Sequence, residues 1–211
     1  MRIAVTSAKG GVGKTTTAVM LAALLGQERP TVLIDGDRQG SALTWRHQAG
    51  EQWPGTLPVE RWTDPLHEQL TRVPSGVHEG LSHVVIDTGP GDPERMRAAV
   101  AAADVVVIPV GARMLDVAQL QDTARIVAGA AHPGLSWGVL LTMRRGATRS
   151  GEIAPAVIER DGFPLWATEV PLRESIAAAA GTYPSPVPAV YRDLLEELRE
   201  VNAEGITDAA R

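Results

Sequence analysis

Short runs of apolar, mostly β-branched residues alternate along the chain with longer segments in which apolar positions recur every three or four residues. The apolar runs cover residues 2–7, 31–35, 83–87, 104–110 and 137–142, and further strands are plausible around residues 59–62 and 165–170. The segments with helical spacing include residues 15–26, 93–103 and 114–130. Near-continuous apolar strands interleaved with helices are typical of a parallel sheet that is covered on both faces. We therefore predict an α/β fold with a doubly wound, mostly parallel sheet and helices on both faces.

A further helical segment covers residues 189–205. One of its faces carries Val190, Leu194, Leu195, Leu198 and Val201. The opposite face carries four carboxylates and two arginines. A helix that lies on a membrane surface needs a basic face at this place. We therefore expect this helix to pack on the domain.

Length and composition restrict the class of protein. A chain of 211 residues fits one α/β domain, so we predict a single domain over residues 1–211, with residues 48–80 as its least regular part. The chain has no cysteine, which excludes disulfides, thiolate metal sites and cysteine nucleophiles. No stretch approaches the roughly 18 apolar residues of a membrane span, so we expect a cytoplasmic protein. The net charge of −5 argues against a wholly basic protein but not against a local basic patch.

The segment KGGVGKTT, residues 9–16, lies between the first apolar run and the first helical segment. It resembles the phosphate-binding pattern G-x-x-x-x-G-K-[ST], except that Ala8 stands at the first glycine position. Lys9 and Lys14 are the only lysines among the chain's 20 basic residues. An ammonium is a compact point charge, whereas a guanidinium is a wide planar fork. Lysine at these two positions alone suggests that both need the compact charge.

This segment has the chemistry of a nucleotide phosphate site. Its glycines let backbone N–H groups turn toward phosphate oxygens, and the helix N-terminus adds its dipole. Lys14 would reach the β- and γ-phosphates, the Thr15 hydroxyl would bind Mg²⁺, and Thr16 would bond the α-phosphate. The alternative is a glycine-rich turn that joins a strand to a helix without any ligand.

Three aspartates stand where apolar runs end. Asp35 and Asp37 follow the second run, and Asp87 ends the run over residues 83–87. Ligands of open parallel sheets bind outside the carboxyl ends of the strands. A carboxylate there can hold a water of the Mg²⁺ shell, as it does in nucleotide hydrolases. Each aspartate taken alone would more often be a turn or cap residue, but together they extend the predicted phosphate site.

These motifs identify a family resemblance that covers nearly the whole chain. KGGVGKTT is similar to the deviant Walker A motif, DGDRQGSALTW to the segment D-x-D-P-Q-G-S-A-T-x-W, and VVIDTGPG to a Walker B motif. The chain thus resembles ParA/MinD-type P-loop ATPases, and among them the small ParA partition ATPases. Arg38 departs from the pattern, which usually has proline there. The resemblance implies ATP and Mg²⁺ as cofactors and ATP hydrolysis as the activity.

The resemblance also implies roles for single residues. Two subunits of such ATPases dimerise face to face over two ATPs, which would make Lys9 the lysine that reaches the partner's nucleotide. Asp37 matches the residue that orients the attacking water, and the metal would be held by Thr15, Asp35 and Asp87. The implied nucleotide contacts are Lys9, Gly10, Gly11, Val12, Gly13, Lys14, Thr15 and Thr16 at the phosphates, and Thr142, Met143 and Pro171 on the adenine side. Arg144, Arg145 and Arg149 would contact DNA without regard to its sequence.

Several branches of the family remain as alternatives. A partition ATPase would be a nucleoid-associated homodimer with ATP, stimulated by a ParB-like, centromere-binding adaptor. A MinD-like positioning ATPase would need a membrane-binding C-terminal helix, which the acidic face disfavours. The absence of cysteine excludes an iron–sulfur relative, and the two tyrosines do not resemble the C-terminal cluster of bacterial tyrosine kinases. Because the first strand begins at Arg2, we expect no N-terminal helix-turn-helix, and hence no operator contact from the chain itself. The acidic C-terminal helix leads us to expect no membrane contact either.

Overall fold

The five apolar runs and the two further predicted strands all lie in one parallel sheet in the computed structural model, which describes residues 1–72, 83–146 and 148–209. The strands are β1 (Arg2–Val5), β2 (Thr31–Gly36), β3 (Val59–Arg61), β4 (His83–Thr88), β5 (Val105–Gly111), β6 (Ser136–Arg144) and β7 (Leu165–Pro171). Their order is β3-β2-β4-β1-β5-β6-β7, and every pairing is parallel. The α/β fold with a parallel sheet is thereby confirmed.

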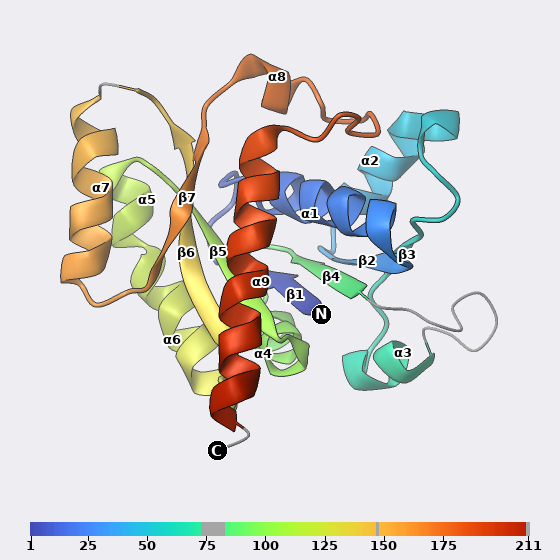
Figure 1. Cartoon of the computed structure of the whole chain (residues 1–211), viewed down its shortest axis with the longest axis horizontal. Helices are drawn as coiled ribbons and strands as arrows, with labels where there is room; N and C mark the ends of the chain where they lie inside the picture. The colour runs from blue at the N-terminus through green and yellow to red at the C-terminus, as the bar shows by residue number, and fades with distance from the viewer. Residues whose placement is uncertain (73–82, 147, 210–211) are drawn as a thin grey trace.

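Helices cover both faces of this sheet (Figure 1). They are α1 (Lys14–Glu28), α2 (Ser41–Ala49), the short 3₁₀ helix η1 (Gly50–Gln52), α3 (Leu66–Arg72), α4 (Pro93–Ala102), α5 (Met114–Ala118), α6 (Leu120–Ala130), α7 (Arg149–Arg160), α8 (Glu174–Ala177) and α9 (Ala189–Ala209). Helices α1, α2 and α9 pack on one face, and α4 to α7 pack on the other. The helix predicted over residues 114–130 is divided at Gln119, whose N–H bonds to the Asp116 carbonyl three residues back instead of continuing the α-helical pattern.

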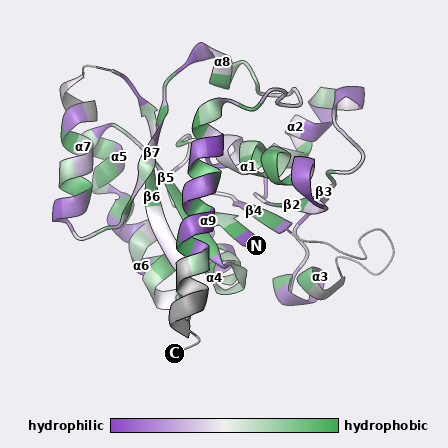
Figure 2. Ribbon diagram, in the orientation of Figure 1, coloured by the Kyte–Doolittle hydropathy of each residue, from purple (hydrophilic) through white to green (hydrophobic). Residues whose placement is uncertain are grey.

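The buried core lies in two layers, one on each side of the sheet. Successive strand residues point to opposite faces, so Ile3 and Val5 pack under α1 while Ala4 packs on the other side. Figure 2 shows the strands as predominantly hydrophobic ribbons between helices that alternate hydrophobic and hydrophilic positions. This double burial explains why the central strands β1, β2, β4 and β5 appear in the sequence as continuous apolar runs.

Helix α9 packs on the domain as predicted. Leu194, Leu195 and Leu198 are buried in the layer that holds α1. Tyr191 is also buried there, although the sequence analysis did not assign it to this face. The Glu197 carboxylate accepts the backbone N–H groups of Ala167 and Thr168 in the edge strand β7, at 2.5 and 3.1 Å. None of the described helices is long and apolar enough to cross a lipid bilayer.

The carboxyl ends of the central strands meet at one edge of the sheet. Strand β1 lies between β4 and β5, with Val5 beside Asp87, and Asp35 of β2 lies beside Asp87 on its other side. The loops that follow β1, β2 and β4 therefore converge. Open parallel sheets bind ligands at this position.

Candidate nucleotide-binding site

The loop from β1 to α1 has the backbone conformation that a phosphate site needs. Gly11 and Gly13 have φ angles of 73° and 87°, which side-chain-bearing residues rarely adopt. Gly13 is the N-cap of α1, and the first turn of α1 contains no acidic residue. The N–H groups and the dipole of a 15-residue helix are thus available to an anion at this place.

The two lysines of the loop lie in different surroundings. Lys14 is buried, and its ammonium donates a 2.6 Å hydrogen bond to the Lys9 carbonyl. Burial lowers the pKa of Lys14, and the charges of Asp87 and Asp37 oppose this change. Lys9 is half-buried, and its ammonium has no hydrogen-bond or ion-pair partner within the described part of the chain. Lys14 is thus held inside the site, whereas Lys9 is available to a group from outside.

Asp87 is fully buried, and neither carboxylate oxygen has a hydrogen-bond partner among the described residues. Burial raises its pKa to about 7; the Thr15 hydroxyl and the Lys14 ammonium act against this rise, while Asp35 adds to it. No group of three acidic or histidine residues within the described ranges could hold a metal by itself. Mg²⁺ in nucleotide sites is usually bound by one or two carboxylates together with phosphate oxygens. An unpartnered carboxylate beside Thr15 fits such an ion or one of its waters.

Asp35 differs from Asp87 in that both its oxygens accept hydrogen bonds. Oδ1 accepts the Asp37 N–H at 3.0 Å, and Oδ2 accepts the Leu43 N–H at 2.8 Å. Asp35 therefore connects the end of β2 to the turn and to the first turn of α2. Of the two aspartates predicted to contact metal, Asp87 fits the role better, because the Asp35 carboxylate already fixes the backbone.

The Asp37 carboxylate has a fixed orientation at the phosphate side of the site. Its Oδ1 accepts the Gln39 N–H at 2.9 Å, and its Oδ2 accepts the Ser41 hydroxyl at 2.8 Å. The segment after β4 lies directly against it, since a Cβ atom on Gly89 would come within 2.8 Å of the Asp37 Oδ1. Asp37 thus presents a carboxylate to the site without touching Lys14.

Two adjoining hollows make up the site. The first, of about 500 Å³, is lined by Gly10, Gly11, Gly13, Lys14, Thr15, Thr16, Asp37, Gln39, Ser41, Pro90 and Met143. The second, of about 140 Å³, is lined by Gly13, Thr16, Thr142, Met143, Val170, Pro171, Leu172, Arg173, Ile176, Ala177 and Tyr191. They share Gly13, Thr16 and Met143. A polar, lysine-bearing hollow that continues into a smaller, more apolar one matches the phosphates and the base of a nucleotide.

The structure brings together all the residues predicted on the adenine side and adds others. Thr142, Met143 and Pro171 line the smaller hollow, and the Thr142 hydroxyl donates to the Val12 carbonyl at 2.9 Å. Met143 has a φ of 52°, a conformation that functional sites often impose on a non-glycine residue. Tyr191 was missed, although it precedes Leu194, Leu195 and Leu198 by three, four and seven residues. That helical spacing was the signal that could have found it.

The three arginines predicted to contact DNA are not equivalent. Arg144 forms an ion pair with Glu169, with 2.7 Å between Nη1 and Oε2, and its side chain is 38% exposed. Arg145 is exposed. Arg149 begins α7, but its side chain lies outside what the structure describes. Because Glu169 already offsets the charge of Arg144, Arg145 is the better-placed cation of the two.

Comparison with known proteins identifies a family and several relatives. The family model described as CbiA, the CobQ/CobB/MinD/ParA nucleotide binding domain, matches residues 3–186. The maintenance of carboxysome distribution protein A of Gloeobacter kilaueensis is 43% identical over 143 residues, which cover 66% of this chain and 62% of that protein, so the match spans less than two thirds of it. The chromosome-partitioning ATPase Soj of Thermus thermophilus is 30% identical over 93% of this chain and 94% of its own.

A solved structure shows the same fold. A putative plasmid partition protein from Borrelia burgdorferi, bound to AMPPNP, has a TM-score of 0.71 at 19% identity, covering 96% of this chain and 98% of that one. The family match extends from β1 almost to α9 and thus includes every loop of the site described above. The chain therefore belongs to the CobQ/CobB/MinD/ParA family of nucleotide-binding domains.

Proposed function

We propose that the protein is an ATPase that binds ATP with Mg²⁺ in the two adjoining hollows. The loop N–H groups and Lys14 would bind the phosphates, and Thr15 and Asp87 would bind the Mg²⁺ ion or its waters. Bound Mg²⁺ would neutralise charge that develops between the β- and γ-phosphates. Asp37 is the proposed water-orienting residue, because its carboxylate lines the phosphate hollow in an orientation fixed by Gln39 and Ser41.

The single observation that carries the proposal is the contrast between the two lysines. A buried Lys14 suffices for a phosphate site of one subunit, so a second ammonium without a partner within the described chain needs another explanation. A cation that meets a γ-phosphate from a second subunit is stabilising only when ATP is bound. We therefore propose an ATP-dependent homodimer in which Lys9 contacts the partner's nucleotide.

The proposed task of this dimer is partition of DNA cargo. The dimer would bind DNA through a basic patch that includes Arg145, and a ParB-like or small DNA-binding adaptor would stimulate hydrolysis and release it. The name of the Gloeobacter relative favours a second candidate, in which the cargo is a protein body such as a carboxysome. The membrane-positioning alternative has less support, because the apolar face of α9 is buried against the sheet.

A DNA co-sedimentation assay tests this proposal. The wild-type protein with ATP and Mg²⁺ should pellet with DNA of any sequence and stay in solution with ADP. Arg145→Ala should weaken binding to all sequences and reduce the log–log salt slope by about 2 per dimer, since each neutralised phosphate contributes about 0.9. Arg160→Ala, at the far end of α7, is the matched control and should bind as the wild type does. Equal binding with ATP and ADP would contradict the proposal.

A further inference from the structure

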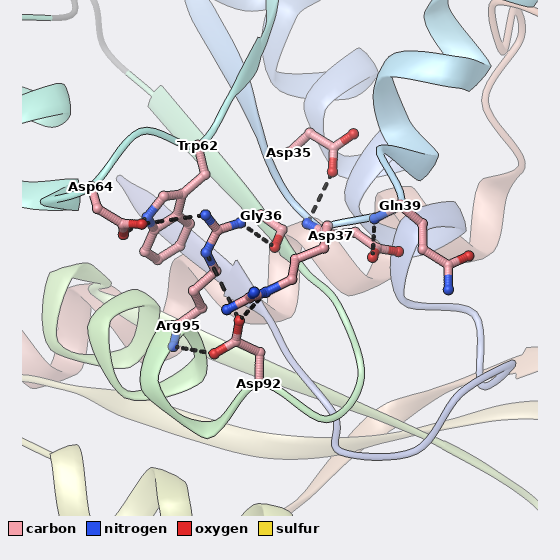
Figure 3. Close-up of polar contacts among 9 residues, drawn as sticks. Asp35, Gly36, Asp37, Gln39, Trp62, Asp64, Asp92 and Arg95 are labelled. Carbon is pink, nitrogen blue, oxygen red and sulfur yellow. Dashed lines mark hydrogen bonds and ion pairs between the residues drawn. The ribbon is translucent and has the colours of Figure 1, made fainter.

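Arg38, the residue that departs from the family pattern, connects two segments of the site. It directly follows Asp37, and its Nε donates to the Asp92 Oδ2 at 2.9 Å. Asp92 belongs to the segment after β4 and is the N-cap of α4, where its Oδ1 accepts the Arg95 N–H at 3.2 Å. One carboxylate thus contacts both the segment that contains Asp37 and the helix that follows the Walker B strand (Figure 3).

Arg95 reaches the same segment from α4. Its Nη1 donates to the Gly36 carbonyl at 3.2 Å, and its Nη2 pairs with Asp64 at 3.3 Å. Its guanidinium lies 5.5 Å from the ring centre of Trp62, whose Nε1 donates to the same Asp64 at 2.6 Å. Figure 3 shows the Arg95 side chain extended between Asp92, Trp62 and Gly36. Its planar fork is therefore held on several sides.

Gly36, whose carbonyl Arg95 contacts, is the last residue of β2 and pairs with Thr88 of β4, so its backbone has little room to move. A Cβ atom on Gly36 would lie 2.7 Å from the Asp87 carbonyl and 2.9 Å from the Trp62 ring. Gly36 is thus enclosed by β4 on one side and by the Arg95 guanidinium at its carbonyl. Because Asp37 is the next residue, the position of the Gly36 backbone determines the position of the Asp37 backbone and therefore of its carboxylate.

Arg38 and Arg95 differ in how far they are buried, and therefore in how much each stabilises the segment that contains Asp37. The Arg38 side chain is 79% exposed, and exposed ion pairs contribute little. The Arg95 and Asp92 side chains are only 19% and 14% exposed. Although burial alone would raise it, the pKa of Asp92 is held below its usual value by the Arg95 N–H and the Arg38 guanidinium, so this carboxylate stays ionised at neutral pH. Arg95 is therefore the main support and Arg38 a secondary one.

We propose that Arg95 is a positioning residue for Asp37, holding the Gly36 carbonyl from α4 while Asp92 joins Arg38 to the same helix. This inference rests on the proposed ATP hydrolysis. Helix α4 begins shortly after β4, so Arg95 and Asp92 connect the end of β4, where Asp87 lies, to the segment that contains Asp37. The end of β4 and this segment therefore move as one unit. A misplacement of about 1 Å at a reacting group can lower a rate about 100-fold.

The test compares Arg95→Gln and Arg95→Lys with Arg97→Gln. Arg97 lies on the same helix, is exposed, and makes no side-chain hydrogen bond or ion pair to any described residue. For each protein, kcat and KM for ATP are measured at a temperature where all variants are folded. Hydrogen exchange is followed at the Gln39 and Gly40 amides, which bond to Asp37.

We expect Arg95→Gln to lower kcat about 10- to 100-fold with KM within about twofold, and to speed exchange at both amides. Arg95→Lys keeps the charge but loses the fork, so it should show the same change to a smaller extent, and it remains informative if Arg95→Gln fails to fold. Arg97→Gln should match the wild type. If the wild type hydrolyses ATP and both Arg95 variants keep its kcat, the positioning role is overturned alone. If the wild type does not hydrolyse ATP even with DNA and partner, the proposed function fails and this inference with it.

Discussion

At the scale of single residues, Asp37 and Asp87 show that one residue type has two different environments in the same site. Both oxygens of Asp37 accept hydrogen bonds within its own turn, whereas neither oxygen of Asp87 has a partner among the described residues. A carboxylate with a fixed orientation suits a water that must be aligned for attack. A buried carboxylate without partners suits a cation that arrives with the nucleotide.

Asp37→Ala should leave ATP affinity within about twofold of the wild type while hydrolysis falls about 100-fold. A water-orienting carboxylate acts in the transition state and contributes little to ground-state binding. Titration with a fluorescent ATP analogue and a phosphate-release assay measure the two quantities. Ser41→Ala, which removes only the 2.8 Å hydrogen bond to Asp37, should give a smaller loss of hydrolysis. A large loss of affinity in Asp37→Ala would give Asp37 a structural role instead.

The raised pKa of Asp87 predicts a pH-dependent stability of the nucleotide-free protein. Burial raises this pKa to about 7, so the unfolded state releases the proton at lower pH than the folded state does. The contribution of the protonated Asp87 carboxyl to the free energy of unfolding is therefore fully present below about pH 4 and is lost as the pH rises through about 7. Asp87→Asn should remove this loss, so the free energy of unfolding of the variant relative to the wild type should grow between about pH 4 and pH 7, by at most about 4 kcal/mol, and level off above pH 7.

Thermal unfolding without nucleotide, at several pH values, checks this prediction. Asp122→Asn is the control, because the Asp122 side chain is 72% exposed and should show no such trend. A pH-independent difference between Asp87→Asn and the wild type would mean that Asp87 is already ionised in the folded protein.

At the scale of elements, apolar patterning predicted the central strands because they are buried on both faces, whereas the edge strands β3 and β7 are partly exposed and have a weaker pattern. Apolar patterning predicted helix boundaries less well where local hydrogen bonds determine them. At Gln119 the helix expected over 114–130 divides into α5 and α6. The phosphate loop was predictable because its chemistry is local. The ion pair of Arg144 with Glu169 and the two N–H bonds of Asp35 were not, because they depend on which groups the fold brings together.

The loop before α1 offers a test of its backbone. Gly13→Ala should lower the free energy of unfolding by about 1–2 kcal/mol, because φ is 87° while space for a Cβ is open, with the nearest atom 4.0 Å away. ATP affinity should fall as well, since the N–H groups at the start of α1 would turn. Gly129→Ala, inside α6 and also in open space, should instead raise stability by about 0.5–1 kcal/mol. Denaturant unfolding of both variants makes the comparison, and a neutral Gly13→Ala would contradict the assigned strain.

At the scale of the whole molecule, the net charge of −5 disfavours contact with a polyanion, so the proposed DNA binding would have to come from a local patch. Joining two copies doubles that patch without adding any new contact. Dimerisation is therefore the step on which the proposed function depends, and Lys9 is the residue that we propose links it to ATP.

Multi-angle light scattering of the wild type and of Lys9→Ala, each with Mg²⁺ and either ADP or a slowly hydrolysed ATP analogue, tests this dependence most directly. We expect the wild type to have the 22.4 kDa mass of one chain with ADP and about twice that mass with the ATP analogue. Lys9→Ala should bind the analogue and keep the mass of one chain, whereas Lys14→Ala should lose the nucleotide altogether. A wild type that stays at one chain's mass with the analogue, or a Lys9→Ala that dimerises normally, would contradict the account.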